Sequence, residues 1–257
     1  MNPTVPLSVT SEIHGILLVD KPTEWTSHDV CAFVRSRFKI PKVGHAGTLD
    51  PHATGLLVLL LGRFTRQSAD WSVCDKDYEG VMEFGVETDS HDRQGKVLKE
   101  TPTDYLTEEM VRSGMKEFVG EIMQIPPMVS AVKHHGKRLY ELARKGQVVE
   151  RESRPAIVYH WDFIEKKEKF VRFKCSVSKG TYVRTLADDL GKKLGCGAVL
   201  SELRRTRCGP FKIENSVLID QLKAMRPEDF STHVILPGAA NHSGLASAPS
   251  EQSPVKK

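Results

Sequence analysis

The sequence predicts an α+β fold with a mixed, largely antiparallel central sheet flanked by helices and loops. Strand-like and helix-like runs follow one another irregularly, without the regular βαβ order of a doubly wound parallel sheet. Residues 55–62, GLLVLLLG, form an unbroken apolar run, as expected of a strand buried on both faces. Residues 76–89, KDYEGVMEFGVETD, alternate apolar and acidic side chains, as expected of a half-buried strand.

The N-terminal elements follow from the same patterns. Residues 15–22 are a short apolar run that ends in proline, which predicts a strand. We expect Ser27 to cap a helix that ends before Pro41. The apolar face of that helix contains Val30, Phe33, Val34 and Phe38. In the acidic strand, Tyr78 is expected on the inner face.

The second half continues in the same mixed manner. A helix is expected over residues 107–120, with Thr107 as its cap and acidic residues in its first turn. Residues 136–146 predict a short basic helix closed by a glycine. Two strands, at 156–164 and 169–178, precede a helix over 182–195 that Thr181 could cap.

The domain organisation is simple. Residues 1–14 are expected to be an N-terminal extension, and residues 15–236 one globular domain. The last 21 residues, 237–257, are rich in Ser, Ala, Pro and Gly and contain almost no large apolar side chain. Such a segment cannot bury enough surface to offset its ordering entropy, so we expect a disordered tail.

Composition excludes several classes of protein. Hydrophobic residues make up 39% of the 257 and charged residues 27%, which is typical of globular proteins. No apolar run approaches the length of a membrane span, and the N-terminus lacks the features of a signal peptide. The five cysteines are scattered without a CxxC pair, so we expect reduced thiols and a cytoplasmic protein.

Positive charge is concentrated in two places. Residues 133–154 contain seven Lys or Arg against three Glu, and residues 203–212, LRRTRCGPFK, form a second cluster. Clustered positive charge is typical of a surface that contacts phosphates, although a solvated helix face is the commoner origin of one basic run.

One acidic residue stands out in residues 44–57, GHAGTLDPHATGLL. Asp50 lies between glycines and an apolar strand, with His45 and His52 on either side. A lone aspartate in a turn is most often a capping residue. A metal site that combines these residues with Asp89, His91 and Asp92 matches no known ligand spacing, so we expect no metal. The chain also lacks a GxSxG elbow and Walker spacing, which disfavours a serine hydrolase and a phosphate-loop NTPase.

The same stretch resembles the GHxGxLDPxATGxL motif of the TruB-type tRNA pseudouridine synthases. Four further segments resemble motifs of that family in the family's order: DKPTEWTSHDV, KDYEGVMEFGVETDSHDRQGKV, QIPPMVSAVKHHGKRLYELARKG and KGTYVRTLADDLGKKLGCGAVLSELRRT. The region they cover is roughly residues 15–213. The first segment departs from its motif, because Glu24 or Trp25 stands where the family usually has glycine.

The resemblance implies the pseudouridine synthase fold and the isomerisation of uridine to pseudouridine in RNA, without a cofactor. By that resemblance Asp50 is the essential carboxylate, Arg184 its ion-pair partner and Tyr78 the residue that stacks on the uracil. Leu203 would pack against the base, and Tyr182 would also contact the substrate. His45 would fill the space left by the extruded nucleotide. Each of these residues, taken alone, has an ordinary structural explanation.

The resemblance also implies a partner, the T-stem-loop of tRNA with its uridine at position 55. The segment 124–153 would clasp the RNA, with phosphate contacts from Lys133, Lys137, Arg138, Arg144 and Lys145. We expect a monomer without a membrane association and without a complete C-terminal PUA domain. Two alternatives stay open: a non-catalytic tRNA chaperone or RNA-binding scaffold, and the RNA-guided relative that acts on ribosomal RNA in a particle.

Overall fold

The computed structural model describes residues 13–236, apart from residues 131, 135, 144 and 148. The expected tail at 237–257 and nearly all of the expected N-terminal extension therefore lie outside the described residues. Within the described part, one ten-stranded sheet organises the molecule. Its main path runs in the order β14 (Val217–Leu218), β1 (Gly15–Lys21), β3 (Thr54–Leu61), β12 (Ala198–Cys208), β4 (Lys76–Phe84), β11 (Phe170–Val177), β10 (Arg154–Lys167) and β7 (Gly120–Gln124).

Most neighbouring strands are antiparallel, and the described sheet contains two parallel pairs, β1 with β14 and β3 with β12. This confirms the predicted mixed, largely antiparallel sheet. Two short strands join it at the side, β2 (Val43–His45) on β3 and β13 (Phe211–Lys212) on β12. Two separate hairpins complete the strands: β5 (Val86–Thr88) with β6 (Val97–Glu100), and β8 (Lys133–His134) with β9 (Lys137–Arg138).

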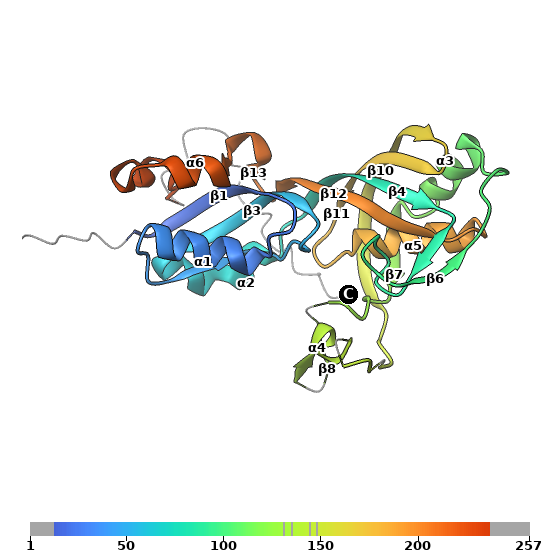
Figure 1. Cartoon of the computed structure of the whole chain (residues 1–257), viewed down its shortest axis with the longest axis horizontal. Helices are drawn as coiled ribbons and strands as arrows, with labels where there is room; N and C mark the ends of the chain where they lie inside the picture. Colours follow the sequence, from blue (N-terminus) through green and yellow to red (C-terminus); the bar gives the residue numbers. More distant parts are fainter. Residues whose placement is uncertain (1–12, 131, 135, 144, 148, 237–257) are drawn as a thin grey trace, which may run out of the picture.

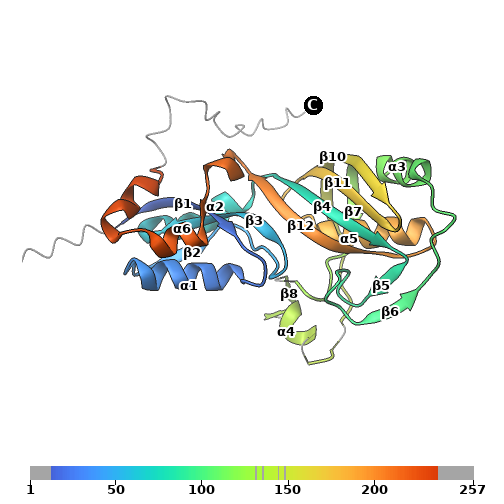
Figure 2. The same ribbon diagram turned by 45° about the horizontal axis from the view of Figure 1, so that its top comes forward.

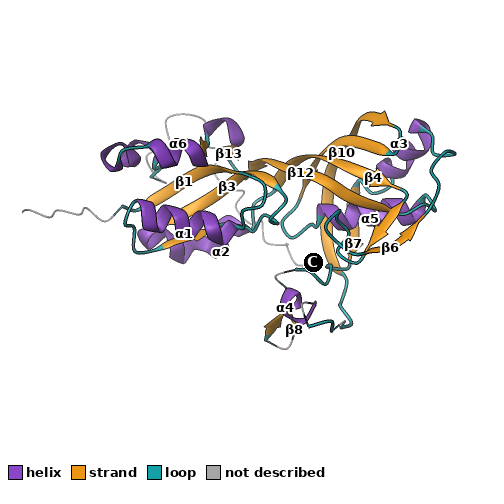
Figure 3. Cartoon of the chain, viewed as in Figure 1, coloured by secondary structure: helices purple, strands orange, loops and turns teal. Residues whose placement is uncertain are grey.

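The helices flank the sheet and do not alternate regularly with its strands (Figure 3). They are α1 (Ser27–Arg37), α2 (Ser68–Ser72), α3 (Glu108–Lys116), α4 (Leu139–Ala143), α5 (Val183–Lys193) and α6 (Ile219–Ala224), with 3-10 turns at Gly62–Gln67, Ile213–Asn215 and Pro227–His233. None of the helices among the described residues has both the length and the apolar character that crossing a bilayer requires.

The molecule is elongated and has two lobes that share the sheet (Figure 1). One lobe contains α1, α2, α6, β1 and β3, and the other contains α3, α5, β7 and β10. The long strands β4 and β12 connect the two lobes, and α4 with β8 projects away from the sheet near their junction (Figure 2).

Strand β3 is buried on both faces, as its unbroken apolar run predicts. Leu57, Leu59 and Leu61 belong to the main hydrophobic core, while Leu56, Val58 and Leu60 belong to a second core on the opposite face. A strand enclosed in this way is held rigidly, because any shift would expose apolar surface on one side. The loop that precedes β3 is therefore fixed at one end.

The first helix begins one residue earlier than predicted. Its N-cap is Thr26, which forms a capping box with Asp29, so the assignment of Ser27 as cap is wrong. Ser27 is instead buried, and its hydroxyl exchanges hydrogen bonds with the backbone of Leu49. The preceding turn keeps a glycine-like conformation at the family's glycine position, since Glu24 has a φ of 67°.

Of the other two predicted helix caps, one is confirmed and one is wrong. Thr107 caps α3 as predicted, although the helix ends at Lys116, before the expected limit of 120. Thr181 does not cap α5: the N-cap is Tyr182, and the Gln124 side chain accepts its backbone N–H at 2.7 Å. The start of α5 is therefore held by Gln124, which is distant in sequence, and not by the local Thr181 cap that the sequence suggested.

The expected basic helix over 136–146 is much shorter in the structure. Only α4 (Leu139–Ala143) is helical, and the residues before it form the β8–β9 hairpin. Gly136 occupies the turn between the two strands with a φ of 82°, which a helix cannot accommodate.

Candidate active site

Asp50 lies on a tight loop between β2 and β3. The loop is tied to the rest of the molecule at two backbone points, since Ala46 N–H donates to the Val58 carbonyl and Leu49 N–H donates to the Ser27 hydroxyl. Within the loop, Ala53 N–H donates to the Asp50 carbonyl. Gly47 supplies a φ of 88°, which permits the sharp bend. The Asp50 side chain is thus held at the end of a strand that cannot move.

Lys21, at the end of β1, connects this loop to the turn that follows β1. Its ammonium group is fully buried and donates to the carbonyls of Pro51 at 2.9 Å, Trp25 at 2.6 Å and Pro22 at 2.8 Å. Burial lowers the pKa of Lys21 to about 8, while the nearby Asp50 acts to raise it. Lys21 therefore fixes the backbone and adds positive charge on the protein side of Asp50.

Arg184 reaches Asp50 from the other lobe, at the start of α5. Its Nε lies 3.2 Å from Asp50 Oδ2, and its Nη2 donates to Asp50 Oδ1 at 3.3 Å. The same guanidinium donates to the carbonyls of Val129 at 2.7 Å and Ser90 at 3.4 Å, and lies 3.9 Å from Asp92 Oδ2. These contacts set the orientation of the guanidinium plane.

The two partners are buried to different degrees. The Arg184 side chain is 4% exposed, whereas that of Asp50 is 43% exposed. Burial raises the pKa of the Asp50 carboxyl, Arg184 lowers it, and Asp92 raises it. The guanidinium thus opposes the effect of the enclosed site on the carboxylate, which remains open to a ligand.

A cavity of about 280 Å³ lies beside this ion pair. Its lining includes Asp50, Arg184, Tyr78, Leu203 and Tyr182. Five of the residues that the sequence pointed to thus meet around one space large enough for a nucleobase. Burial raises the pKa of Tyr78, so its hydroxyl carries a proton in the resting structure.

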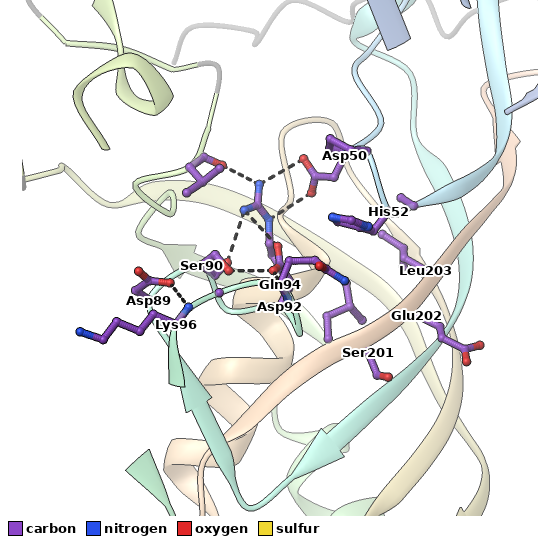
Figure 4. Close-up of a pocket in the computed structure, with 16 residues that line it drawn as sticks. Asp50, His52, Asp89, Ser90, Asp92, Gln94, Lys96, Ser201, Glu202 and Leu203 are labelled. Atoms are coloured by element: carbon purple, nitrogen blue, oxygen red, sulfur yellow. Dashed lines mark hydrogen bonds and ion pairs between the residues drawn. The ribbon is translucent and has the colours of Figure 1, made fainter. Parts of the chain in front are cut away.

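A second pocket, of about 380 Å³, opens on the other side of the ion pair. Figure 4 shows Asp50 at its rim, with Ser90, Asp92 and Gln94 from the turn after β5 across from Leu203 on β12. Asp50 and Arg184 line both spaces. The ion pair is therefore shared by two neighbouring pockets.

Other predicted binding residues lie outside the 280 Å³ cavity. His45 is half-buried at the end of β2, five residues before Asp50. In the clasping segment, Lys133, Lys137 and Arg138 contribute backbone to the β8–β9 hairpin, Lys145 is exposed after α4, and Arg144 lies outside the described residues. The segment contacts the site through the Val129 carbonyl that accepts from Arg184.

Sequence reasoning missed three residues of the site, namely Lys21, Gln124 and Arg205. All three lie in the motif segments given above, but the sequence does not show that their side chains are buried. Polar side chains are rarely buried without a specific role. Within the described ranges, no group of three or more His, Cys, Asp or Glu side chains is arranged to hold a metal ion.

Comparison with known proteins identifies the family. Residues 35–183 match the model of the TruB family pseudouridylate synthase N-terminal domain, and residues 184–238 match that of the tRNA pseudouridylate synthase B C-terminal domain. The chain belongs to the TruB family. This confirms the resemblance drawn from the five motifs, and the family boundary at 183–184 falls beside Arg184.

Relatives within the TruB family are similar over most of their length. The tRNA pseudouridine synthase B of Opitutus terrae is 47% identical over 83% of this chain and 89% of its own length. A relative of the same name from Dehalococcoides mccartyi is 45% identical over 87% of this chain and 74% of its own length.

Solved structures share the fold. A chain in the crystal structure of a Cbf5-Nop10-Gar1 complex has a TM-score of 0.66 and 32% identity, over 86% of this chain and 60% of that one. A chain in the structure of an H/ACA RNP bound to a substrate RNA containing 2'-deoxyuridine has a TM-score of 0.63 and 28% identity. The match covers 87% of this chain and 59% of that one. This TruB-family chain thus spans about three-fifths of the length of those neighbours.

Proposed function

We propose that this chain isomerises uridine to pseudouridine in tRNA, at position 55 of the T-loop. The observation that carries the proposal is the paired carboxylate Asp50, held by Arg184 and accessible from a cavity lined by Tyr78 and Leu203. Family membership and the tRNA pseudouridine synthases among its relatives support the choice of reaction and of RNA.

The reaction rearranges bonds within one nucleotide. The bond from the ribose C1′ to uracil N1 breaks, a bond from C1′ to C5 forms, and one proton moves from C5 to N1. No atom enters or leaves, so the chemistry requires no cofactor. Asp50 either attacks C1′ or takes a proton from C2′ to give a glycal, and both routes require the ionised carboxylate.

The uracil has to leave its stack before it can reach Asp50. Extrusion costs a few kcal/mol, which contacts in an enclosed pocket can recover. Tyr78 and Leu203, which both line the cavity, offer an aromatic and an apolar surface for the freed base. Basic residues of the segment 124–153 are suited to the phosphates of the stem-loop.

We further propose that the chain acts on its own as a cytoplasmic monomer, with no metal. Its five cysteines are all free thiols, as is usual in a reducing compartment.

The direct test is incubation with an unmodified tRNA transcript, followed by mapping of pseudouridine. We expect modification at the T-loop uridine, and none in a control transcript that carries cytidine there. Folded protein that leaves the first transcript unmodified, or that modifies other positions instead, would contradict the proposal.

A further inference from the structure

Strand β12 carries three arginines whose surroundings differ. Arg204 forms a bidentate pair with Asp20, and Arg207 forms one with Asp77. Arg205 is fully buried, and its two hydrogen bonds go to neutral backbone carbonyls, from Nε to Leu56 at 2.7 Å and from Nη2 to Gly47 at 3.3 Å. Within the described ranges, no carboxylate pairs with this buried charge, an arrangement that costs free energy.

The position of Arg205 connects the parts of the candidate site. Leu56 and Gly47 lie after and before Asp50, so the guanidinium fixes both ends of the Asp50 loop. In the sheet, Arg205 is directly opposite Tyr78 on the antiparallel strand β4, and residues opposite each other share a face. On the other side of Arg205, Gly55 permits the close approach of β3 to β12, because a Cβ there would lie 2.3 Å from the Arg205 carbonyl oxygen.

One nitrogen of this guanidinium remains unused. Arg205 Nη1 is buried and has no hydrogen-bond partner among the residues that the structure describes. Arg205 lines the same cavity as Tyr78 and Asp50. Burial raises the pKa of Tyr78, and the positive charge of Arg205 acts in the opposite direction. A buried cation with a spare donor is suited to an oxygen that becomes negatively charged during a reaction.

The proposed isomerisation creates such an oxygen. The phenol of Tyr78 can give its proton to N1 as the glycosidic bond breaks. After the base has turned and C5 has joined C1′, the phenolate takes the C5 proton, and the C5–H electrons form the C5=C6 double bond. The net change is the transfer of one proton from C5 to N1, and Tyr78 ends as it began.

We propose that Arg205 is a positioning residue for this reaction: it holds Tyr78 and the Asp50 loop in register and stabilises the transient Tyr78 phenolate. The inference rests on the proposed function and adds a residue to which no role has been given.

The test compares Arg205→Lys, which keeps the charge, with Arg205→Gln, which keeps a donor and loses the charge. Single-turnover rates are measured at saturating tRNA, together with tRNA affinity and thermal unfolding. We expect Gln to lower the rate about 100-fold, the usual cost of losing a charge-stabilising donor, with affinity nearly unchanged. Lys should be at least about tenfold faster than Gln at a similar unfolding temperature.

Arg207 provides the matched control. It lies two residues further along β12, outside the candidate site, and its charge is already paired with Asp77. Arg207→Gln and Arg207→Lys should have equal rates, close to the wild type. If Arg205→Gln fails to fold, Arg205→Met takes its place, because an apolar side chain of similar length is often tolerated where a charge was buried.

Equal single-turnover rates for Arg205→Lys and Arg205→Gln would overturn the inference. So would decreases in rate that are proportional to the decrease in unfolding temperature of each variant. In either case the wild type would still make pseudouridine. An inactive wild type would instead overturn the proposed function, so the two failures are distinguishable.

Discussion

At the scale of single residues, the central feature is the unequal burial of Asp50 and Arg184. The guanidinium is almost completely buried and held by backbone carbonyls as well as by Asp50, so it cannot turn away. The carboxylate is held by Arg184 on one side and open to the cavity on the other. A group that has to meet a ligand while charged benefits from this arrangement.

Replacing Arg184 should change the pH dependence of the reaction as well as its rate. Burial raises the pKa of Asp50, and Arg184 is the strongest influence in the opposite direction. In Arg184→Gln the pKa of Asp50 therefore rises further, and more of the carboxyl is protonated at a given acidic pH. We expect a rate at least about 100-fold lower, with an acid limb that begins at higher pH than in the wild type.

Single-turnover rates between pH 4.5 and 8 check this, with Arg112→Gln, a partly exposed residue of α3 outside the site, as the control. An acid limb that stays at the wild-type position in Arg184→Gln would contradict the assigned electrostatic role.

At the scale of elements, the Asp50 loop depends on neighbours that are distant in sequence. Lys21 at the end of β1 holds the carbonyl after Asp50, and Ser27 in α1 holds the backbone before it. The loop is therefore shaped by tertiary contacts, and its own sequence supplies mainly the flexibility of Gly47.

Lys21→Met should weaken this support. The buried ammonium group donates to three carbonyls, and its loss leaves them without that donor. We expect the free energy of unfolding to fall by about 1–3 kcal/mol and the turnover rate to fall with it. Urea denaturation measures the first quantity.

Lys167→Met is the control for Lys21, because its side chain is 76% exposed on β10. It should change the free energy of unfolding by no more than about 0.5 kcal/mol. A Lys21→Met protein as stable as this control would show that the three hydrogen bonds contribute little.

At the scale of the whole molecule, the candidate site lies at the junction of the two lobes. Asp50 comes from the lobe built on β1 and β3, and Arg184 from the lobe that contains α5 (Figure 1). Strand β12 runs between them and provides Leu203 and Arg205 to the same cavity. The geometry of the site therefore depends on the entire sheet.

Local patterns in the sequence were sufficient to predict the strands around Asp50 and Tyr78 and the N-cap of α3. They failed where tertiary contacts replace local ones, as at Thr181, because the residue that begins α5 is Tyr182, and its backbone N–H is held by Gln124 on β7. They also missed β12, the strand at the centre of the sheet, because its arginines read as a basic surface. In the structure, Arg204 and Arg207 are paired with aspartates and Arg205 is buried. A central strand can therefore contain several arginines, which the alternation of apolar and polar residues does not reveal.

The sequence motifs predicted that Asp50, Tyr78, Arg184 and Leu203 belong to one site, and all four line one cavity. Lys21 and Arg205 were not predicted, since nothing local indicates that a cation will be buried. Their roles depend on which carbonyls surround them, and only the folded chain determines that.

The most direct test of the central claim measures tRNA binding and pseudouridine formation side by side for the wild type and Asp50→Asn. The amide keeps the size of the carboxylate and removes its charge. We predict that Asp50→Asn binds tRNA with an affinity close to the wild type and forms no detectable pseudouridine. Conversion by Asp50→Asn at a rate within about tenfold of the wild type would contradict the claim that an ionised Asp50 performs the chemistry.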